Sequence, residues 1–307
     1  MGVLSDEVNL LIDASLSGNT KQVYTQALSA FTSFLREYNI QACWPPTLQQ
    51  LVQFVAHLSK FKKISFSTIN AYLSGISFYL KINNLQDFTR AFVIQKMLCG
   101  LRRIHPVKDT RMPITLDMLK QLTSALPFVC TSIYEANLFK AAFVVAFFGF
   151  LRVSEIAVDG VQAKNTIPVQ ASDICMSDHS CTLRIPASKT DQYGNSASLI
   201  FSQSSDPAIC PVRRMTIFLQ ARPRFNGPLF CHFSGAPLTK YQFRAVLFKC
   251  LKFCNIKAKI TSHSFRIGSA TLASSLSIPE EDIKRMGRWS NRGSTHKRYI
   301  RLQQIIP

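Results

Sequence analysis

The stretch ITSHSFRIGSATLASSLSIPEEDIKRMGRWSNRGSTHKRYIR, residues 260–301, contains the residues around which the rest of the chain is organised. His263 and Arg266 stand three positions apart, directly after Thr261 and Ser262, which are both good helix N-caps. We therefore expect the His and Arg side chains on one face of a helix that begins here. From that face both can reach one ligand.

Two aromatic residues follow this predicted helix. Pro279 marks the start of a short helix and Gly287 marks its end, so Trp289 is predicted on the turn that leaves it. A third helical segment, from about Ser294, carries Tyr299. A buried structural tyrosine rarely has so many cationic or potentially cationic neighbours, which here are His296, Lys297, Arg298 and Arg301.

The order of these motifs resembles the C-terminal part of the tyrosine recombinase (phage integrase) family. HSFR, GRW and KRYIR stand where that family has His-x-x-Arg, a Gly-His or Gly-x-Trp turn, and the nucleophilic Tyr. The GRW and KRYIR strings look closest to eukaryotic mobile-element recombinases of the DIRS-like and Crypton-like kinds. That resemblance implies a nuclear protein; in a bacterial host the compartment is the cytoplasm.

The string GFLRVSEI, residues 149–156, is a second point of resemblance. In the family this Arg, here Arg152, binds the scissile phosphate, and the acidic residue three positions later, here Glu155, supports the site. A planar guanidinium can hold two phosphate oxygens as charge builds up in the transition state. Without the resemblance, Arg152 and Glu155 are equally well explained as an i,i+3 pair at a helix end.

A small antiparallel sheet is predicted between residues 173 and 201. The short β-rich runs DICM, CTLRIPASK and SASLIF are separated by DHS and TDQYGN. Lys189 ends the second run, beside the turn at Gly194. The resemblance implies that Lys189 is the general acid that protonates the departing 5′ oxygen of DNA, a role that a lysine of lowered pKa can fill. The alternative is an ordinary turn lysine.

The remaining segments have helical periodicity, so the predicted fold class is mainly α with a small antiparallel β-sheet in the catalytic domain. The resemblance implies a helical core-binding (SAM-like) DNA-binding domain at residues 1–105, a linker at 106–113 and a catalytic domain at 114–307, arranged as a two-domain DNA clamp. The first domain is expected to hold four or five helices. The predicted helices lie near residues 20–39, 47–60, 67–82, 88–104, 115–126, 134–150, 206–221, 239–254 and 265–276.

The chain is strongly basic. Lys and Arg number 36 against 17 acidic residues, which gives a net charge of +19 that is spread along the sequence. This favours an extended anionic partner such as nucleic acid, although a generically basic protein has the same composition. The resemblance implies that the partner is double-stranded DNA. The basic residues expected to contact DNA phosphates are Lys60, Lys62, Lys63, Arg102, Arg103, Lys108, Arg111, Lys297 and Arg298.

Composition excludes several other classes. Nine cysteines without a Cys-x-x-Cys pair indicate reduced thiols in a cytosolic or nuclear protein, with neither a disulfide framework nor a zinc site. The longest apolar run, Ala141 to Leu151, is too short to span a bilayer. We expect no metal, no cofactor, no membrane and no small-molecule substrate.

The resemblance implies one reaction for these residues. Tyr299 attacks a DNA phosphate to give a 3′-phosphotyrosine and a free 5′-hydroxyl. Arg152 and Arg266 hold the phosphate oxygens, His263 assists proton transfer, and Trp289 donates its indole N–H or packs. The family carries out recombination, integration or excision of mobile elements in a synaptic homo-tetramer. Its members exchange a C-terminal segment, for which the candidates here are Ile300, Leu302, Ile305 and Ile306.

Two other functions remain open from the sequence. A domesticated DNA-binding protein can keep the fold without the chemistry, although the complete set of Arg, Lys, His, Arg, Trp and Tyr argues against decay. A type IB topoisomerase shares the nucleophile and the phosphate-binding arginines, and differs chiefly in lacking tetrameric synapsis.

Overall fold

The structure of the chain is a computed structural model that describes residues 2–106, 108–160, 168–186, 196–290 and 293–301. These residues are mainly α-helical, with one three-stranded antiparallel sheet, which confirms the predicted fold class. The chain divides into two compact units, unit 1 (Met1–Asp109) and unit 2 (Thr110–Pro307). None of the described helices is both long and apolar enough to cross a bilayer.

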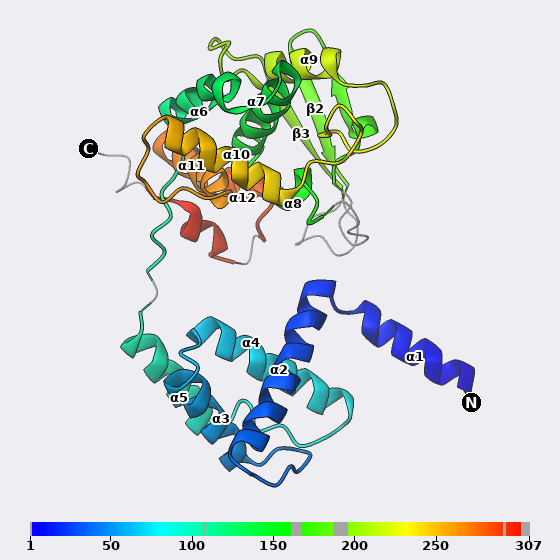
Figure 1. Ribbon diagram of the computed structural model, residues 1–307, viewed down its shortest axis with the longest axis vertical. Coiled ribbons are helices and arrows are strands. Elements are labelled where there is room, and N and C mark those ends of the chain that lie inside the picture. The colour runs from blue at the N-terminus through cyan, green and yellow to red at the C-terminus, as the bar shows by residue number, and fades with distance from the viewer. Residues whose placement is uncertain (1, 107, 161–167, 187–195, 291–292, 302–307) are drawn as a thin grey trace. The chain divides into compact units, whose positions relative to one another are not determined.

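Unit 1 is a bundle of helices with well-defined starts. Ser17, Thr47 and Ser65 each accept a hydrogen bond from a backbone N–H in the first turn of the helix that follows. The last helix begins later than predicted, because Asp87 forms a turn by accepting the backbone N–H of Thr89 at 2.9 Å. The helices are α1 (Gly2–Ala14), α2 (Gly18–Glu37), α3 (Leu48–Lys60), α4 (Phe66–Ile82) and α5 (Phe92–Ile104) (Figure 1).

The core of unit 1 is aromatic. Phe54 lies 5.1 Å from Phe31 and 5.5 Å from Phe34, measured between ring centroids. Gly75 allows α4 to pack directly on α2, since a β-carbon at this position would lie 3.0 Å from the Cα of Tyr24. Helix α1, which the sequence analysis did not predict, contributes no buried side chain among its described residues.

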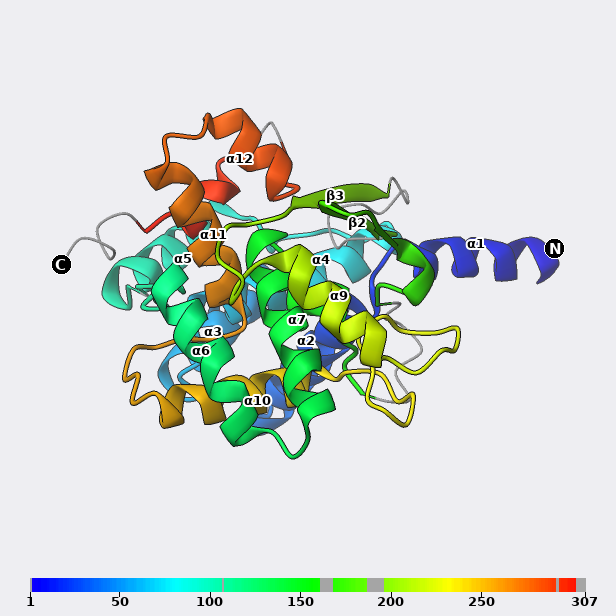
Figure 2. The ribbon, with the colours of Figure 1, turned by 90° about the horizontal axis from the view of Figure 1, so that it is seen from above.

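Unit 2 is built around α7 (Ile133–Phe148), in which every residue from 141 to 147 is apolar and buried. Figure 2 shows α7 between α6 (Leu116–Val129) and α9 (Pro211–Ala221). Helix α9 starts at Pro211 and not near residue 206 as predicted, because Asp206 accepts the backbone N–H of Ala208 at 2.9 Å and forms a turn. The other elements are α8 (Val153–Ile156), α10 (Lys240–Phe253), α11 (His263–Ser275), α12 (Glu280–Met286) and the 3-10 helices η1 (Ala171–Asp173) and η2 (Thr295–Tyr299).

The sheet of unit 2 has the predicted three strands, β1 (Ile174–Met176), β2 (Ser180–Ile185) and β3 (Ala197–Ser202). Both pairings are antiparallel, with Leu183 opposite Ile174 on one side and Leu199 on the other. Burial alternates along β2 as expected for a sheet with one covered face. Lys189 and Gly194 lie between β2 and β3, outside the described residues.

Helix α11 is joined closely to the start of unit 2. The Ile114 N–H donates to the Ser264 carbonyl at 3.1 Å. A β-carbon at Gly268 would lie 2.0 Å from the Ile114 carbonyl oxygen, so only glycine permits this approach. The predicted capping is wrong in detail: Ser262 makes no side-chain cap, and Ser264 Oγ instead accepts the N–H of Thr261 at 2.9 Å.

Candidate active site

The turn before Arg152 has an unusual backbone. The predicted helix 134–150 ends at Phe148, and Phe150 has a φ of +49°, in the left-handed region that costs a non-glycine residue about 1–2 kcal/mol. This conformation directs the Phe150 carbonyl toward two guanidinium groups, those of Arg266 and Arg288. Local strain of this kind is common at functional sites.

Glu155 is the centre of a buried charge network. Its carboxylate is 3% exposed. One oxygen, Oε1, lies 3.2 Å from Arg152 Nη1, and the other accepts from the Arg152 backbone N–H and from Arg288 Nη2, both at 2.9 Å. The i,i+3 pair is therefore real, but the same carboxylate also binds a residue far along the chain. Arg152 is held in place by this carboxylate.

Arg288 is a residue of this site that the sequence analysis missed. Its Nη1 donates to the Gly149 carbonyl at 3.1 Å, and its Nη2 donates to the Phe150 carbonyl at 3.2 Å and to Glu155. Burial lowers the pKa of Arg288, and the nearby Arg152 adds to this effect. The signal was present in the GRW motif itself, where a cation stands between the helix stop and Trp289.

Arg266 is fully buried. Its two Nη groups donate to the carbonyls of Phe150 and Gly287. Its guanidinium lies 4.4 Å from the ring centroid of Trp289 and 5.5 Å from that of Tyr299. Burial, with a smaller contribution from the other two arginines, lowers the pKa of Arg266 to about 9.

Trp289 and Tyr299 pack against each other over this arginine. Their ring centroids are 5.1 Å apart, and Trp289 is 7% exposed. Gly287 ends α12 as predicted, and it is required because a β-carbon there would lie 1.9 Å from the Trp289 ring. The Tyr299 carbonyl accepts from Thr271 Oγ1 at 3.2 Å, which fixes the end of η2 on α11.

The site carries an excess of positive charge. Three guanidinium groups, those of Arg152, Arg266 and Arg288, adjoin one carboxylate, so the formal charge of the cluster is +3 − 1 = +2. Such a cluster is suited to an anion with several oxygens, for which arginine is the preferred partner. Each Nη of Arg266 donates to one carbonyl, and its Nε has no hydrogen-bond partner among the described residues, so Nε–H and the second N–H of each Nη are the donors left for an anion.

Two predicted site residues, His263 and Lys189, are not among those that the structure brings together around Glu155 and Arg266. His263 is the first residue of α11 and is exposed, whereas Arg266, one turn later, is buried. Lys189 lies outside the described residues. The structure thus brings together Arg152, Glu155, Arg266, Trp289 and Tyr299, and adds Arg288.

Several of the predicted DNA contacts lie together in unit 1. Lys60 and Lys63 line a cavity of about 690 Å³ with His105. Phe66, at the start of α4, also lines this cavity, and the Arg102 guanidinium lies 5.9 Å from its ring centroid. Of the others, Lys62 bonds to Glu37, Arg111 is half-buried, and Arg103, Lys108, Lys297 and Arg298 are exposed.

No group of three or more His, Cys, Asp or Glu side chains is arranged to hold a metal ion within the described ranges. The cationic group that contacts the Tyr299 ring is the guanidinium of Arg266, within the part of the chain that the structure describes.

Comparison with known proteins agrees with this architecture. Residues 8–86 match the family model described as "Phage integrase, N-terminal SAM-like domain". No curated protein matches the sequence. Among solved structures, the chain is similar to the XerH site-specific recombinase bound to its difH substrate, with a TM-score of 0.65 and 15% identity over 91% of this chain and 75% of that one.

Two further structures have the same fold. A lambda integrase dimer bound to a COC′ core site has a TM-score of 0.64 and 14% identity over 96% of this chain and 93% of that one. The Tn1549 transposon integrase in complex with circular intermediate DNA has a TM-score of 0.60 and 14% identity over 93% and 90%. At these identities the likeness establishes a shared fold: residues 8–86 match a phage integrase domain, and the chain as a whole folds like the tyrosine recombinases.

Proposed function

We propose that this protein cleaves and rejoins DNA strands through a 3′-phosphotyrosine intermediate, with Tyr299 as the nucleophile. The observation that carries this proposal is the packing of the Tyr299 ring against the guanidinium of Arg266, beside the Arg152–Glu155–Arg288 network. A phenol next to a cationic cluster of formal charge +2 is well placed to attack a phosphodiester, whose charge increases in the transition state.

In the proposed reaction, the Tyr299 oxygen forms a bond to phosphorus as the bond from phosphorus to the 5′ oxygen breaks. His263 assists removal of the phenol proton, and Lys189 gives a proton to the departing 5′ oxygen. Arg152 and Arg266 bind the non-bridging oxygens. Loss of one such donor is expected to cost about 3 kcal/mol, or roughly a hundredfold in rate. Attack by a 5′-hydroxyl of another strand reverses the step and joins the new partners.

The similar proteins extend this proposal to recombination. XerH is described as a site-specific recombinase and Tn1549 integrase as a transposon integrase, each bound to DNA. We propose the corresponding roles here: integration or recombination of a mobile element, by a homo-tetramer on paired sites. Unit 1 is then the core-binding domain and unit 2 the catalytic domain, with the exposed cations Lys60, Lys63 and Arg102 on DNA phosphates.

The finer assignment to DIRS-like or Crypton-like elements, and with it a nuclear location, rests on the GRW and KRYIR motifs. A fluorescent fusion of the chain in a eukaryotic cell tests the location. Accumulation in the nucleus supports it, and uniform distribution in the cytoplasm contradicts it.

Covalent trapping tests the reaction. The protein is incubated with supercoiled plasmid and with nicked duplexes of candidate sites, denatured in SDS and examined for protein–DNA adducts. Tyr299→Phe should abolish the adduct. Tyr241→Phe is the matched control, because Tyr241 is 75% exposed on α10 and should not affect it.

The outcomes separate the candidate functions. An adduct that survives Tyr299→Phe refutes the assignment of the nucleophile. Relaxation of plasmid without assembly on paired sites indicates a type IB topoisomerase. Salt-sensitive DNA binding without any adduct indicates a DNA-binding protein that lacks the chemistry.

A further inference from the structure

His296 is a buried histidine that the proposed reaction does not use. Its side chain is 1% exposed, and it is the buried residue of η2, the short helix that carries Tyr299. Residues three apart lie on the same side of a 3-10 helix, which has three residues per turn. Both rings lie close to Trp289, at 6.4 Å for His296 and 5.1 Å for Tyr299 between ring centroids. The way in which His296 is held therefore sets the direction of the Tyr299 side chain.

Glu280, the first residue of α12, is the acidic partner of His296. The distance from His296 Nε2 to Glu280 Oε1 is 3.0 Å, although the two groups do not have the angle of a hydrogen bond, so the contact is electrostatic. The same carboxylate lies 2.9 Å from Lys284 Nζ and 4.0 Å from Lys297 Nζ. The hydrogen bond from Lys284 lowers the pKa of Glu280, so this carboxyl group is ionised at neutral pH.

A second attachment of η2 lies at its C-terminal end. Thr271 Oγ1 donates to the Tyr299 carbonyl at 3.2 Å and accepts the N–H of Arg301 at 3.1 Å. These bonds fix the backbone at Tyr299, but one point of attachment leaves a short helix free to rotate about its axis. The contact of His296 with Glu280 lies one turn earlier, so it supplies the second point that fixes the rotation.

Helix α12 connects this contact with the arginine cluster. Glu280 is its first residue, and the carbonyl of Gly287, the residue that ends it, accepts from Arg266. The helix has seven residues and is about 10 Å long at 1.5 Å per residue. One short element therefore binds the segment of the nucleophile at one end and the buried guanidinium at the other. The placement of Tyr299 against Arg266 depends on both ends.

We propose that His296 and Glu280 are positioning residues that hold Tyr299 in place for its attack on DNA. The inference rests on the proposed function, since it assigns the pair a role in the step that Tyr299 carries out. Neither side chain transfers a proton or binds the phosphate in this role. A displacement of the nucleophile by about 1 Å can lower the rate roughly a hundredfold, so loss of the contact should slow cleavage without weakening DNA binding.

Three variants of the full-length chain test the contact. His296→Phe keeps a ring against Trp289 and removes the ring nitrogens, Glu280→Ala removes a carboxylate that is 49% exposed, and the third variant carries both changes. In single-turnover covalent trapping at saturating protein, on the nicked duplex that gives the wild-type adduct, each single variant should form the adduct about ten- to a hundredfold more slowly. The dissociation constant for that duplex should stay within about threefold. The double variant should be no slower than the slower single variant, because the contact is already lost.

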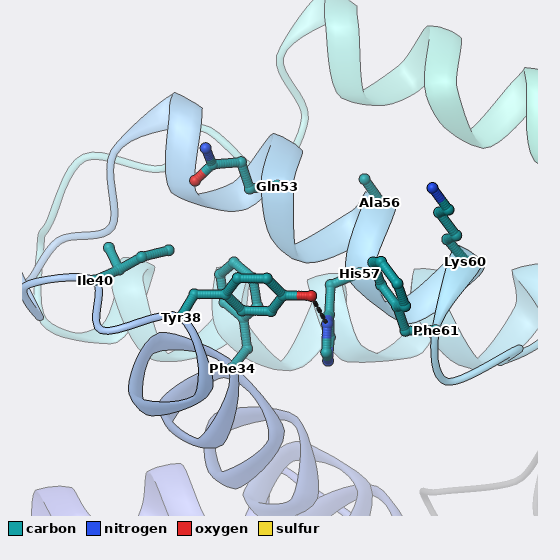
Figure 3. Close-up of a pocket in the computed structure, with 8 residues that line it drawn as sticks. All are labelled: Phe34, Tyr38, Ile40, Gln53, Ala56, His57, Lys60 and Phe61. Atoms are coloured by element: carbon teal, nitrogen blue, oxygen red, sulfur yellow. Dashed lines mark hydrogen bonds between the residues drawn. The ribbon is translucent and has the colours of Figure 1, made fainter.

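Two controls make the same changes elsewhere. Glu281→Ala removes the adjacent exposed acid from the first turn of α12, so it controls for the interaction of an acid with the helix dipole. His57→Phe changes the other buried histidine of the described chain, which lies in unit 1 and bonds through Nδ1 to the Tyr38 hydroxyl at 3.2 Å (Figure 3). Both controls should form the adduct within about twofold of the wild-type rate.

Acrylamide quenching tests the contact without DNA. In a Trp44→Phe background the fluorescence comes from Trp289, which is 7% exposed and lies against the rings of His296 and Tyr299. If η2 loosens, Trp289 becomes accessible, so the Stern–Volmer constant should rise at least about twofold in Glu280→Ala and stay unchanged in Glu281→Ala.

Three results overturn the proposal. One is wild-type adduct formation by either single variant at saturating protein. Another is a double variant whose loss in rate is the product of the two single losses, which would show that the residues act independently. The last is equal quenching of Trp289 in Glu280→Ala and Glu281→Ala. A wild-type chain that forms no adduct instead refutes the proposed function, and the quenching experiment then decides alone whether the contact fixes the segment of Tyr299.

Discussion

Replacing Glu155 by Gln should strongly destabilise unit 2. The change keeps the shape of the side chain but removes its charge from a position that is 3% exposed and that receives bonds from Arg152 and Arg288. Breaking a buried ion pair from one side costs about 3–5 kcal/mol. Glutamine keeps one oxygen acceptor, so we expect the free energy of unfolding to fall by about 2–4 kcal/mol.

An exposed ion pair in α12 provides the matched control for Glu155→Gln, and Trp289 provides a fluorescent probe of unfolding. Asp282 forms an i,i+3 pair with Arg285 at 2.7 Å, but these side chains are 41% and 82% exposed. Asp282→Asn makes the same carboxylate-to-amide change and should cost less than about 1 kcal/mol. The chain has two Trp, so a Trp44→Phe background leaves Trp289, in unit 2, as the fluorescent reporter during urea unfolding. Equal losses in the two variants would refute the view that Glu155 is a buried centre of charge.

Four other outcomes can be measured. Gly268→Ala should destabilise unit 2 by about 3 kcal/mol or more, because its β-carbon would lie 2.0 Å from a backbone oxygen. Gly100→Ala is the control in parallel urea titrations and should be neutral or stabilising, because Gly100 has open space around it in α5. Burial lowers the pKa of Arg266 from the ordinary 12.5 to about 9, so the loss of stability caused by burying its charge is complete at pH values well below 9 and declines as the pH rises through 9. Between pH 8 and pH 10 the unfolding free energy of the wild type should therefore rise by about 1 kcal/mol relative to that of Arg266→Met. Arg288→Lys should slow DNA cleavage and leave DNA affinity nearly unchanged, because lysine cannot bind Glu155 and two carbonyls at once. Single-turnover cleavage and equilibrium binding measure the two effects separately, and a loss of affinity alone would contradict this role. With Ellman's reagent at pH 8, the exposed Cys99 and Cys175 should react first, because burial raises the pKa of Cys181 to about 11 and that of Cys250 to about 12. Fast labelling of these buried thiols would show that unit 2 opens readily.

The sequence predicted those parts of the fold that depend on local pattern. Helix α6 begins near residue 115 as predicted, Gly287 ends α12, and the three β-rich runs form β1, β2 and β3, because alternation and turn residues are local signals. The predicted starts of α5 and α9 were less accurate, because the side chain of Asp87 or Asp206 accepts the backbone N–H two residues later and forms a turn before the helix. Helix α1 was missed because none of its described side chains is buried, and a short apolar pattern without a core is a weak signal.

The candidate site was predicted only as a set of residues. Motif order placed Arg152, Glu155, Arg266, Trp289 and Tyr299 in one group, but it did not predict that Arg266 is fully buried beneath the two rings. That arrangement depends on the left-handed backbone at Phe150, which the chain adopts through tertiary contacts of its carbonyl. A glycine would have indicated the conformation in advance, and phenylalanine conceals it.

The shared carboxylate of Glu155 also affects how the protein is made. It bonds to one arginine three residues away and to another that is 133 residues further along the chain. During synthesis, the first pair emerges long before Arg288 exists, so the carboxylate lacks its second partner until the last tenth of unit 2 arrives. Contacts of such long sequence separation form late and slow folding. A nascent or truncated chain that ends before residue 288 therefore holds the predicted phosphate-binding arginine without the geometry that fixes it, and the site matures as one of the final events of folding.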